Sequence, residues 1–417
     1  MRRLWLLLLP CLFLPDLGNM TPSDVGTGEF ADFLIGPYVL LTYLAGEKQG
    51  WGEWRRHRGL LVAFVAWALL STLTINLRYG YSQIDVIRFG LVKVGKFVTY
   101  ALAGLLTMRA LEKDRTARLL FPWAVLGACL VVSVTMILLR GSEVSRDAAR
   151  VGFSSGNGMS VALAMMYCWM TAYFLSRHPS REWCVALGVT APVLLVGLFF
   201  SDGRGGWVAG LIASGYIALR FGVRPPLIAA ALAGALTLVA TYETESGFRT
   251  QVDMTLDPAR LSYQSEFAAS TGIDDGSRLE IWKNEAPKLI NAPLLGTGFF
   301  HRGGYSGLYS TGSHNFWLEM FLETGVVGGV LVLTVLWKMW RAAGARWPEA
   351  AGVGIPARAA LIAAFIGGLG EGYFYGGKVL LTLFMVVAPV WSLPFEDSPR
   401  KALASRARVL APNSGTT

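Results

Sequence analysis

The chain has few charged residues, and this excludes an ordinary soluble protein. Only 16% of its 417 residues are charged, whereas 53% are hydrophobic. Soluble domains carry about 25% charged residues, so this composition predicts a membrane protein. The apolar runs also lack the strict apolar/polar alternation of membrane-barrel strands. The sequence therefore predicts helices as the membrane-spanning elements.

Cysteine is scarce as well. The four cysteines, Cys11, Cys129, Cys168 and Cys184, lie singly in or beside apolar runs. They show neither the spacing of a disulfide framework nor that of a zinc site. No DNA-binding or RNA-binding motif is present, so the net charge of +9 is best explained by basic cytoplasmic loops. We expect membrane lipids and no nucleic acid as partners.

Recurring apolar segments predict an all-α polytopic membrane protein of about twelve transmembrane helices. The first segment, residues 1–15, starts like a signal peptide but lacks a small-x-small cleavage pattern, so we interpret it as a short uncleaved span. The predicted spans lie near 1–15, 30–45, 59–76, 83–108, 119–139, 158–176, 183–200, 206–220, 226–242, 315–337, 357–373 and 378–394.

The distribution of Lys and Arg predicts that both termini are cytoplasmic. Helices 1–9 then occupy residues 1–242, a large outer loop occupies 243–314, helices 10–12 occupy 315–394, and 395–417 form a cytoplasmic tail. Within the loop, residues 279–289 have helical spacing of apolar residues. Pro293 and the glycines after it end that pattern. We expect short helices lying over the outer membrane surface.

Three polar residues fall on the outer face in this topology: Arg204, Arg278 and His314. The planar fork of arginine pairs bidentately with phosphate oxygens, and a neutral histidine suits a general base. The pattern thus favours an anionic, phosphate-bearing substrate. Structural alternatives stay open, because His314 could cap a helix, Arg204 could anchor its turn by snorkelling, and Arg278 could pair with Glu280 or Asp275.

Basic residues also occur inside the fourth predicted span, at Arg88, Lys93 and Lys96. Arg88 and Lys96 are eight residues apart and so lie near one face of a helix. Charges within hydrocarbon are costly and usually face a cavity or a partner. Two interpretations stay open: these side chains bind substrate phosphates, or they snorkel to the interface.

One stretch resembles a known family. His314-Asn315, nine further residues, and then Gly325-x-x-Gly328 resemble the histidine motif of the O-antigen ligases, within the O-antigen ligase and polymerase superfamily. Gly329 and Val330 stand where some ligases carry hydroxyl residues, so a polymerase of the same superfamily remains an alternative.

Two other segments are similar to further motifs of that family. They are the short turn that holds Arg204, and Arg278-x-x-x-Trp282 followed by Pro293, Gly296 and Gly298. The arrangement of about twelve spans with one large outer loop before the last spans also resembles the family. The similarity therefore extends from short motifs to the whole architecture.

The resemblance implies a GT-C-like glycosyltransferase in the bacterial inner membrane, with its active site on the periplasmic side. The implied reaction transfers undecaprenyl-pyrophosphate-linked O-antigen to a sugar hydroxyl of the lipid A-core oligosaccharide. His314 would be the general base, and Arg204 and Arg278 would hold the pyrophosphate. Asn315 and Trp282 are expected to contact substrate. Direct attack by the hydroxyl would invert the anomeric centre without a covalent enzyme intermediate.

We expect no cofactor and no metal. Asp274 and Asp275 resemble the acidic pairs that bind metal in other glycosyltransferases, but two carboxylates alone rarely suffice. Arg278 nearby argues that a guanidinium replaces the cation. The alternatives are an O-antigen polymerase, an O-linked protein oligosaccharyltransferase, and a non-enzymatic lipid or polysaccharide transporter. A transporter would usually show internal repeats, and we detect none.

Overall fold

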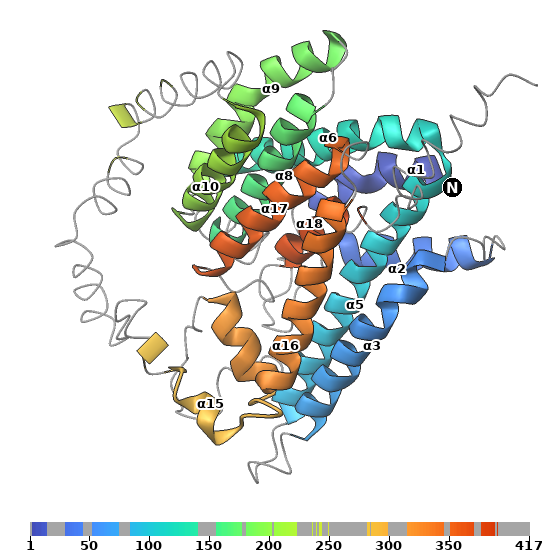
Figure 1. Ribbon diagram of the computed structural model, residues 1–417, viewed down its shortest axis with the longest axis vertical. Helices are drawn as coiled ribbons and strands as arrows, with labels where there is room; N and C mark the ends of the chain where they lie inside the picture. Colours follow the sequence, from blue (N-terminus) through green and yellow to red (C-terminus); the bar gives the residue numbers. More distant parts are fainter. Residues whose placement is uncertain are drawn as a thin grey trace, which may run out of the picture.

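The computed structural model is helical throughout the residues it describes, with no strand among them (Figure 1). It describes residues 2–14, 30–44, 52–74, 84–140, 156–176, 181–201, 204–222, 236, 239, 242–243, 249, 282–283, 285–298, 315–345, 351–370, 377–387 and 390. The all-α prediction is confirmed for this part of the chain.

The helices follow the apolar runs in order. They are α1 (Arg2–Leu8), the 3-10 helix η1 (Leu9–Phe13), α2 (Phe30–Leu44), α3 (Gly52–Leu73), α5 (Ile84–Lys113), α6 (Arg115–Arg140), α8 (Gly156–Ser176), α9 (Arg181–Phe200), α10 (Arg204–Phe221), α15 (Lys288–Asn291), α16 (Phe316–Ala345), α17 (Ala351–Gly368) and α18 (Gly377–Val386).

Each predicted span except 226–242 coincides with one or two of these helices. Residues 226–242 lie outside the described part of the chain, apart from the helical residues Leu236, Val239 and Tyr242. Four stretches are long and apolar enough to cross a membrane: Gly90–Leu111, Thr116–Leu138, Gly158–Leu175 and Phe316–Gly344. The chain is thus a helical membrane protein, and the number of twelve spans stays a prediction.

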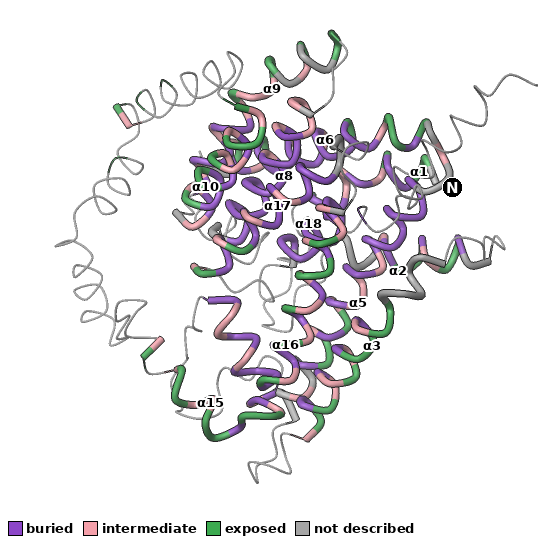
Figure 2. Tube along the Cα trace, viewed as in Figure 1, coloured by how far each residue is buried: buried purple, intermediate pink, exposed green. Residues whose placement is uncertain are grey.

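Helix α8 lies at the centre of the bundle and contacts α6, α9, α10, α17 and α18 (Figures 1 and 2). Its residues are buried on every side, as expected for an apolar helix without a polar face. Small residues bring α10 close to it. A Cβ at Gly206 would lie closer than 3.0 Å to Ser160, and one at Gly210 would touch Ala164. Close packing of small residues is typical of helix pairs in membranes.

The basic segment between α5 and α6 was predicted as a cytoplasmic loop, but the two helices extend through it and leave only Asp114 between them. Asp114 Oδ1 accepts hydrogen bonds from the N–H groups of Thr116 (2.9 Å) and Ala117 (3.2 Å) and so caps the start of α6. Arg118 Nε donates to the Leu111 carbonyl at the end of α5 (2.7 Å). Caps at both helix ends remove the need for a longer connection.

Two contacts identify opposite ends of the bundle. At one end, Arg3 Nε donates to Asp114 Oδ2 over 2.8 Å, tying α1 to the α5–α6 junction. At the other end, the buried Lys378 at the start of α18 donates through Nζ to the Leu14 carbonyl over 2.6 Å. Both pairs join residues that the predicted topology places on the same side of the membrane.

Candidate functional site

The predicted site residues are described to different extents. His314 and Arg278 lie outside the described residues. Arg204 is the first residue of α10, and Arg88 lies in α5, but the side chains of both fall outside the description. Lys96 and Trp282 are half-buried, on α5 and just before α15 respectively. The described part of the candidate site therefore consists of the surroundings of residues 204 and 315.

Asn315, directly after His314, caps the start of α16. Its Oδ1 accepts hydrogen bonds from the N–H groups of Trp317 (3.0 Å) and Leu318 (3.1 Å). Its carbonyl accepts the N–H of Glu319 (2.9 Å), and the residue is only 8% exposed. An asparagine with this pattern is a strong helix start. The structure gives Asn315 a positioning role, while its contact with substrate remains a prediction.

Helix α16 is not one continuous helix. Gly325 interrupts it with φ 67° and ψ −176°, a conformation that side-chain-bearing residues avoid. Phe316 and Val332 line the same pocket, although a straight helix would place them about 24 Å apart. We call residues 316–324 the short arm and 326–345 the long arm, and Figure 1 shows the two arms folded back on each other. The predicted span over 315–337 is therefore a helical hairpin.

Residues 292–298, at the end of the predicted outer loop, lie directly against the bend. Val326 N donates to the Pro293 carbonyl (2.8 Å), Thr297 N to the Leu322 carbonyl (2.7 Å), and Gly298 N to the Glu323 carbonyl (3.0 Å). Breaking a helix leaves backbone groups without their usual partners, and buried backbone groups are normally paired. The loop supplies partners on both sides of the break.

Glycines permit these close approaches. A Cβ at Gly325 would lie closer than 3.0 Å to the backbone of Leu294, and a Cβ at Gly296 (φ 68°) would lie equally close to the backbone of Glu323. On the long arm, Gly329 leaves room for the ring of Phe321 on the short arm. The glycines therefore provide the space for the hairpin and for the loop segment that covers its bend.

The short arm also contacts the end of α17. Trp317 Nε1 donates to the Phe365 carbonyl over 3.2 Å, and the two rings lie 4.7 Å apart. Phe365 is close to the last residue of α17, Gly368. The residues directly after His314 are thus held against one end of the central bundle.

The start of α10 lies at that same end. Tyr216, late in α10, and Arg358, in the first half of α17, both lie against Trp340. The Tyr216 and Trp340 ring centroids are 6.4 Å apart, and the guanidinium carbon of Arg358 is 4.7 Å from the Trp340 centroid. Because α10 and α17 pack together, they run antiparallel. Residue 204 therefore begins α10 at the end where Phe365 meets the short arm.

The comparison with protein families bears on this same region. Residues 189–333 match the family model described as O-antigen ligase. The match supports a place for this part of the chain in the O-antigen ligase and polymerase superfamily. No curated protein matches the chain.

The O-antigen ligase match starts within α9 and includes α10, the outer loop and most of the α16 hairpin. Arg204, Arg278, Trp282, His314 and Asn315 all lie inside it. Arg88 and Lys96 lie outside it, so the family match gives no support to a role for these two residues.

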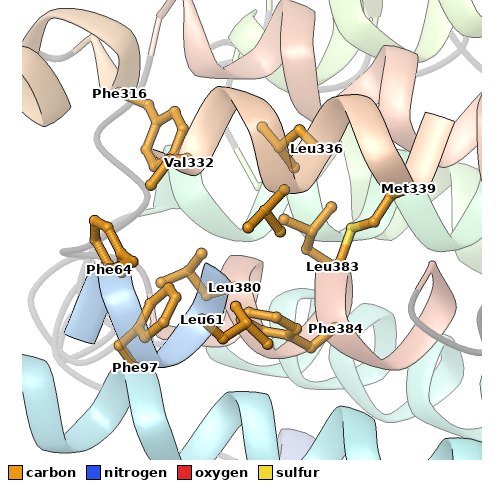
Figure 3. A pocket seen from close by; sticks show the side chains of 11 residues that line it. Leu61, Phe64, Phe97, Phe316, Val332, Leu336, Met339, Leu380, Leu383 and Phe384 are labelled. Carbon is orange, nitrogen blue, oxygen red and sulfur yellow. The ribbon is translucent and has the colours of Figure 1, made fainter. Parts of the chain in front are cut away.

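A small apolar pocket of about 30 Å³ lies beside the start of the short arm (Figure 3). Its lining is entirely hydrophobic and comes from α3, α5, both arms of α16, and α18. Phe316, two residues from His314, points into it together with Phe64, Phe97 and Phe384. Its apolar lining offers no polar group to a phosphate.

Two buried carboxyl groups on the short arm were missed by sequence reasoning. Glu319 and Glu323 are 3% and 5% exposed and follow Asn315 at intervals of four residues, on one helical face. The sequence does contain a signal for them, because acidic residues are rare in an apolar span and tend to be functional when they occur there. Trp67 and Ser71 of α3, which contact the bend, carried no such signal.

Proposed function

We propose that this protein is an O-antigen ligase. It transfers undecaprenyl-pyrophosphate-linked polysaccharide to a sugar hydroxyl of lipid A-core oligosaccharide at the periplasmic face of the inner membrane. The observation that carries the proposal is the O-antigen ligase match over 189–333, which contains His314, Arg204 and Arg278.

The donor pyrophosphate is held by the two arginines. Arg204 as the first residue of α10 supports this role, because a helix amino terminus carries partial positive charge and free N–H groups that favour anions. Arg278 provides a second bidentate fork.

His314 acts as the general base. The acceptor hydroxyl oxygen attacks the anomeric carbon and gives its proton to the imidazole, whose ordinary pKa near ~6.5 suits that task. The bond from the anomeric carbon to the pyrophosphate oxygen breaks, and its electron pair leaves with undecaprenyl pyrophosphate. The arginines stabilise that charge, so neither a metal nor a covalent enzyme intermediate is needed.

The geometry of the residues that follow His314 supports a shared site. Residue 314 immediately precedes the cap of the short arm, and the short arm is bonded to Phe365 at the end of the bundle where α10 begins. An imidazole and a guanidinium at these two positions could reach one substrate.

The test is transfer in vitro from an undecaprenyl-pyrophosphate glycan, with purified protein and three separate acceptors. We expect sugar to appear on rough lipopolysaccharide and transfer to persist in EDTA. In His314→Ala we expect transfer to fall to a small residual rate while donor binding persists. Arg204→Ala and Arg278→Ala should weaken use of the glycan donor, and Arg204→Lys and Arg278→Lys should restore little of it, because lysine lacks the bidentate fork.

Other outcomes would change the assignment. Sugar gained only by a glycan-carrier acceptor would make the protein a polymerase, and sugar gained only by a peptide would make it a protein oligosaccharyltransferase. Loss of activity in EDTA that magnesium or manganese reverses would refute the metal-free mechanism. Normal turnover by His314→Ala would refute the base assignment.

A further inference from the structure

Helix α3 lies outside the family match and carries none of the predicted site residues, yet two of its side chains reach the bend of α16. Trp67 Nε1 donates to the Thr324 carbonyl over 2.8 Å. Ser71 Oγ lies 2.9 Å from the Glu323 carbonyl oxygen and 2.5 Å from that of Leu295. Ser71 is fully buried.

These side chains supply hydrogen-bond partners for backbone carbonyls at the break in α16. Gly325 turns the chain away, so the carbonyls just before it cannot all accept the helical N–H groups four residues later. The loop supplies N–H groups from Thr297 and Gly298, and α3 supplies an indole N–H and a hydroxyl. The bend is therefore held from two sides.

Ser71 also connects two segments that carry predicted catalytic residues. One of its acceptors, Glu323, belongs to the short arm that begins after His314. The other acceptor, Leu295, belongs to the loop end that leads back through α15 towards Arg278. A hydroxyl has one proton, so this proton is shared between the two carbonyls and ties the segments together.

We infer that Trp67 and Ser71 are positioning residues for the transfer reaction, and that they act by fixing the hairpin that places residue 314. This inference rests on the proposed function. A displacement of about 1 Å can lower a rate by up to 10²-fold when a catalytic group must meet its substrate at hydrogen-bond distance. Loss of the Trp67 N–H or of the Ser71 hydroxyl is expected to lower kcat more than it weakens binding of the glycan substrate.

Three variants of α3 test this. Ser71→Ala removes the shared hydroxyl, and Trp67→Phe removes the N–H but keeps an aromatic ring. Thr72→Ala is the matched control, because Thr72 is equally buried and its hydroxyl bonds to the Ala68 carbonyl within α3. We expect kcat per folded protein to fall about tenfold in the first two variants and less than twofold in the control, with the donor KM within about twofold throughout.

A double-mutant cycle separates positioning from general stability. If Ser71 and Trp67 act through the histidine, their variants should cause no further loss of the residual activity in a His314→Ala background. A purely structural role would lower that residual activity by the same factor as in wild type. If Ser71→Ala fails to fold, the same cycle can be measured with Trp67→Phe, because that substitution removes only the hydrogen-bonding N–H and keeps an aromatic ring.

Failure of the inference and failure of the proposed function give different results. Wild-type protein that transfers sugar to no acceptor refutes the proposed function and this inference together. Wild-type protein that transfers normally, with Ser71→Ala and Trp67→Phe indistinguishable from Thr72→Ala, overturns the inference alone. Equal fractional losses with and without His314 overturn it as well.

Discussion

Replacing Gly325 with alanine should collapse the hairpin on which the site depends. The added Cβ would lie closer than 3.0 Å to Leu294, whose backbone atoms cannot simply rotate away. The glycine also has φ 67° and ψ −176°, a region open essentially to glycine alone, and other residues there cost about 1–3 kcal/mol.

The steric overlap adds to this strain. If the loop segment moves away from the bend, the three backbone hydrogen bonds made by the N–H groups of Thr297, Gly298 and Val326 are lost. Each is worth about 0.5–1.5 kcal/mol. The total is about 2.5–7.5 kcal/mol, which is a large share of the ~5–15 kcal/mol that stabilises a typical protein.

The chain can escape this cost by straightening α16, because alanine is better than glycine in a helix by about 1 kcal/mol. Residue 314 would then lie about 16 Å from residue 325 along the helix axis, since the two are eleven positions apart. Either outcome removes His314 from its site. We expect transfer activity below about 1% of wild type, given the sensitivity of catalysis to ångström-scale displacement.

The measurement combines thermal unfolding in detergent with the transfer assay. Gly188→Ala in α9 is the control, because its Cβ meets nothing within 4 Å and the substitution also replaces a helical glycine. A Gly325→Ala protein that unfolds at the wild-type temperature and keeps at least half of the wild-type rate would show that the bend is dispensable.

Three further substitutions have smaller expected effects. Asn315→Ala should cost about 1 kcal/mol of stability through loss of the cap, and Asn315→Asp should restore it in thermal unfolding. Lys378→Met should cost about 1–3 kcal/mol, because the Leu14 carbonyl loses a charged donor; an unchanged unfolding temperature would contradict this. The hydrogen bond from Arg3 lowers the pKa of Asp114 below 3.8, so its stabilisation is present above about pH 4 and is lost as pH falls through the folded pKa. The difference in unfolding temperature between wild type and Asp114→Asn should thus be constant near neutrality and shrink in acid.

The helices were predictable because their signal is local. A long apolar run that must satisfy its own backbone groups has few alternatives to a helix. The ends were less predictable, as the α5–α6 junction shows. There the basic residues suggested a loop, but Asp114 and Arg118 cap the helix ends and allow the chain to turn at one residue.

The hairpin in α16 was not predictable from its own residues. Glycine is tolerated within helices, and the run from Phe316 to the end of α16 contains no proline. The bend depends on partners far away in sequence: Trp67 and Ser71 of α3, and the loop end at 292–298. Such partners become visible only when the chain is folded, which is also why the role of α3 was missed.

The hairpin explains why nine residues separate Asn315 from Gly325 in the histidine motif. The nine residues between Asn315 and Gly325 form the short arm, which is about 13 Å long. Both of its ends are fixed: Asn315 caps one end, where Trp317 bonds to Phe365, and the loop holds the other at Gly325. Adding or removing one residue would rotate one end by about 100° relative to the other and break one of these attachments. The spacing is therefore a length constraint, and the chemistry proposed for this motif belongs to His314 alone.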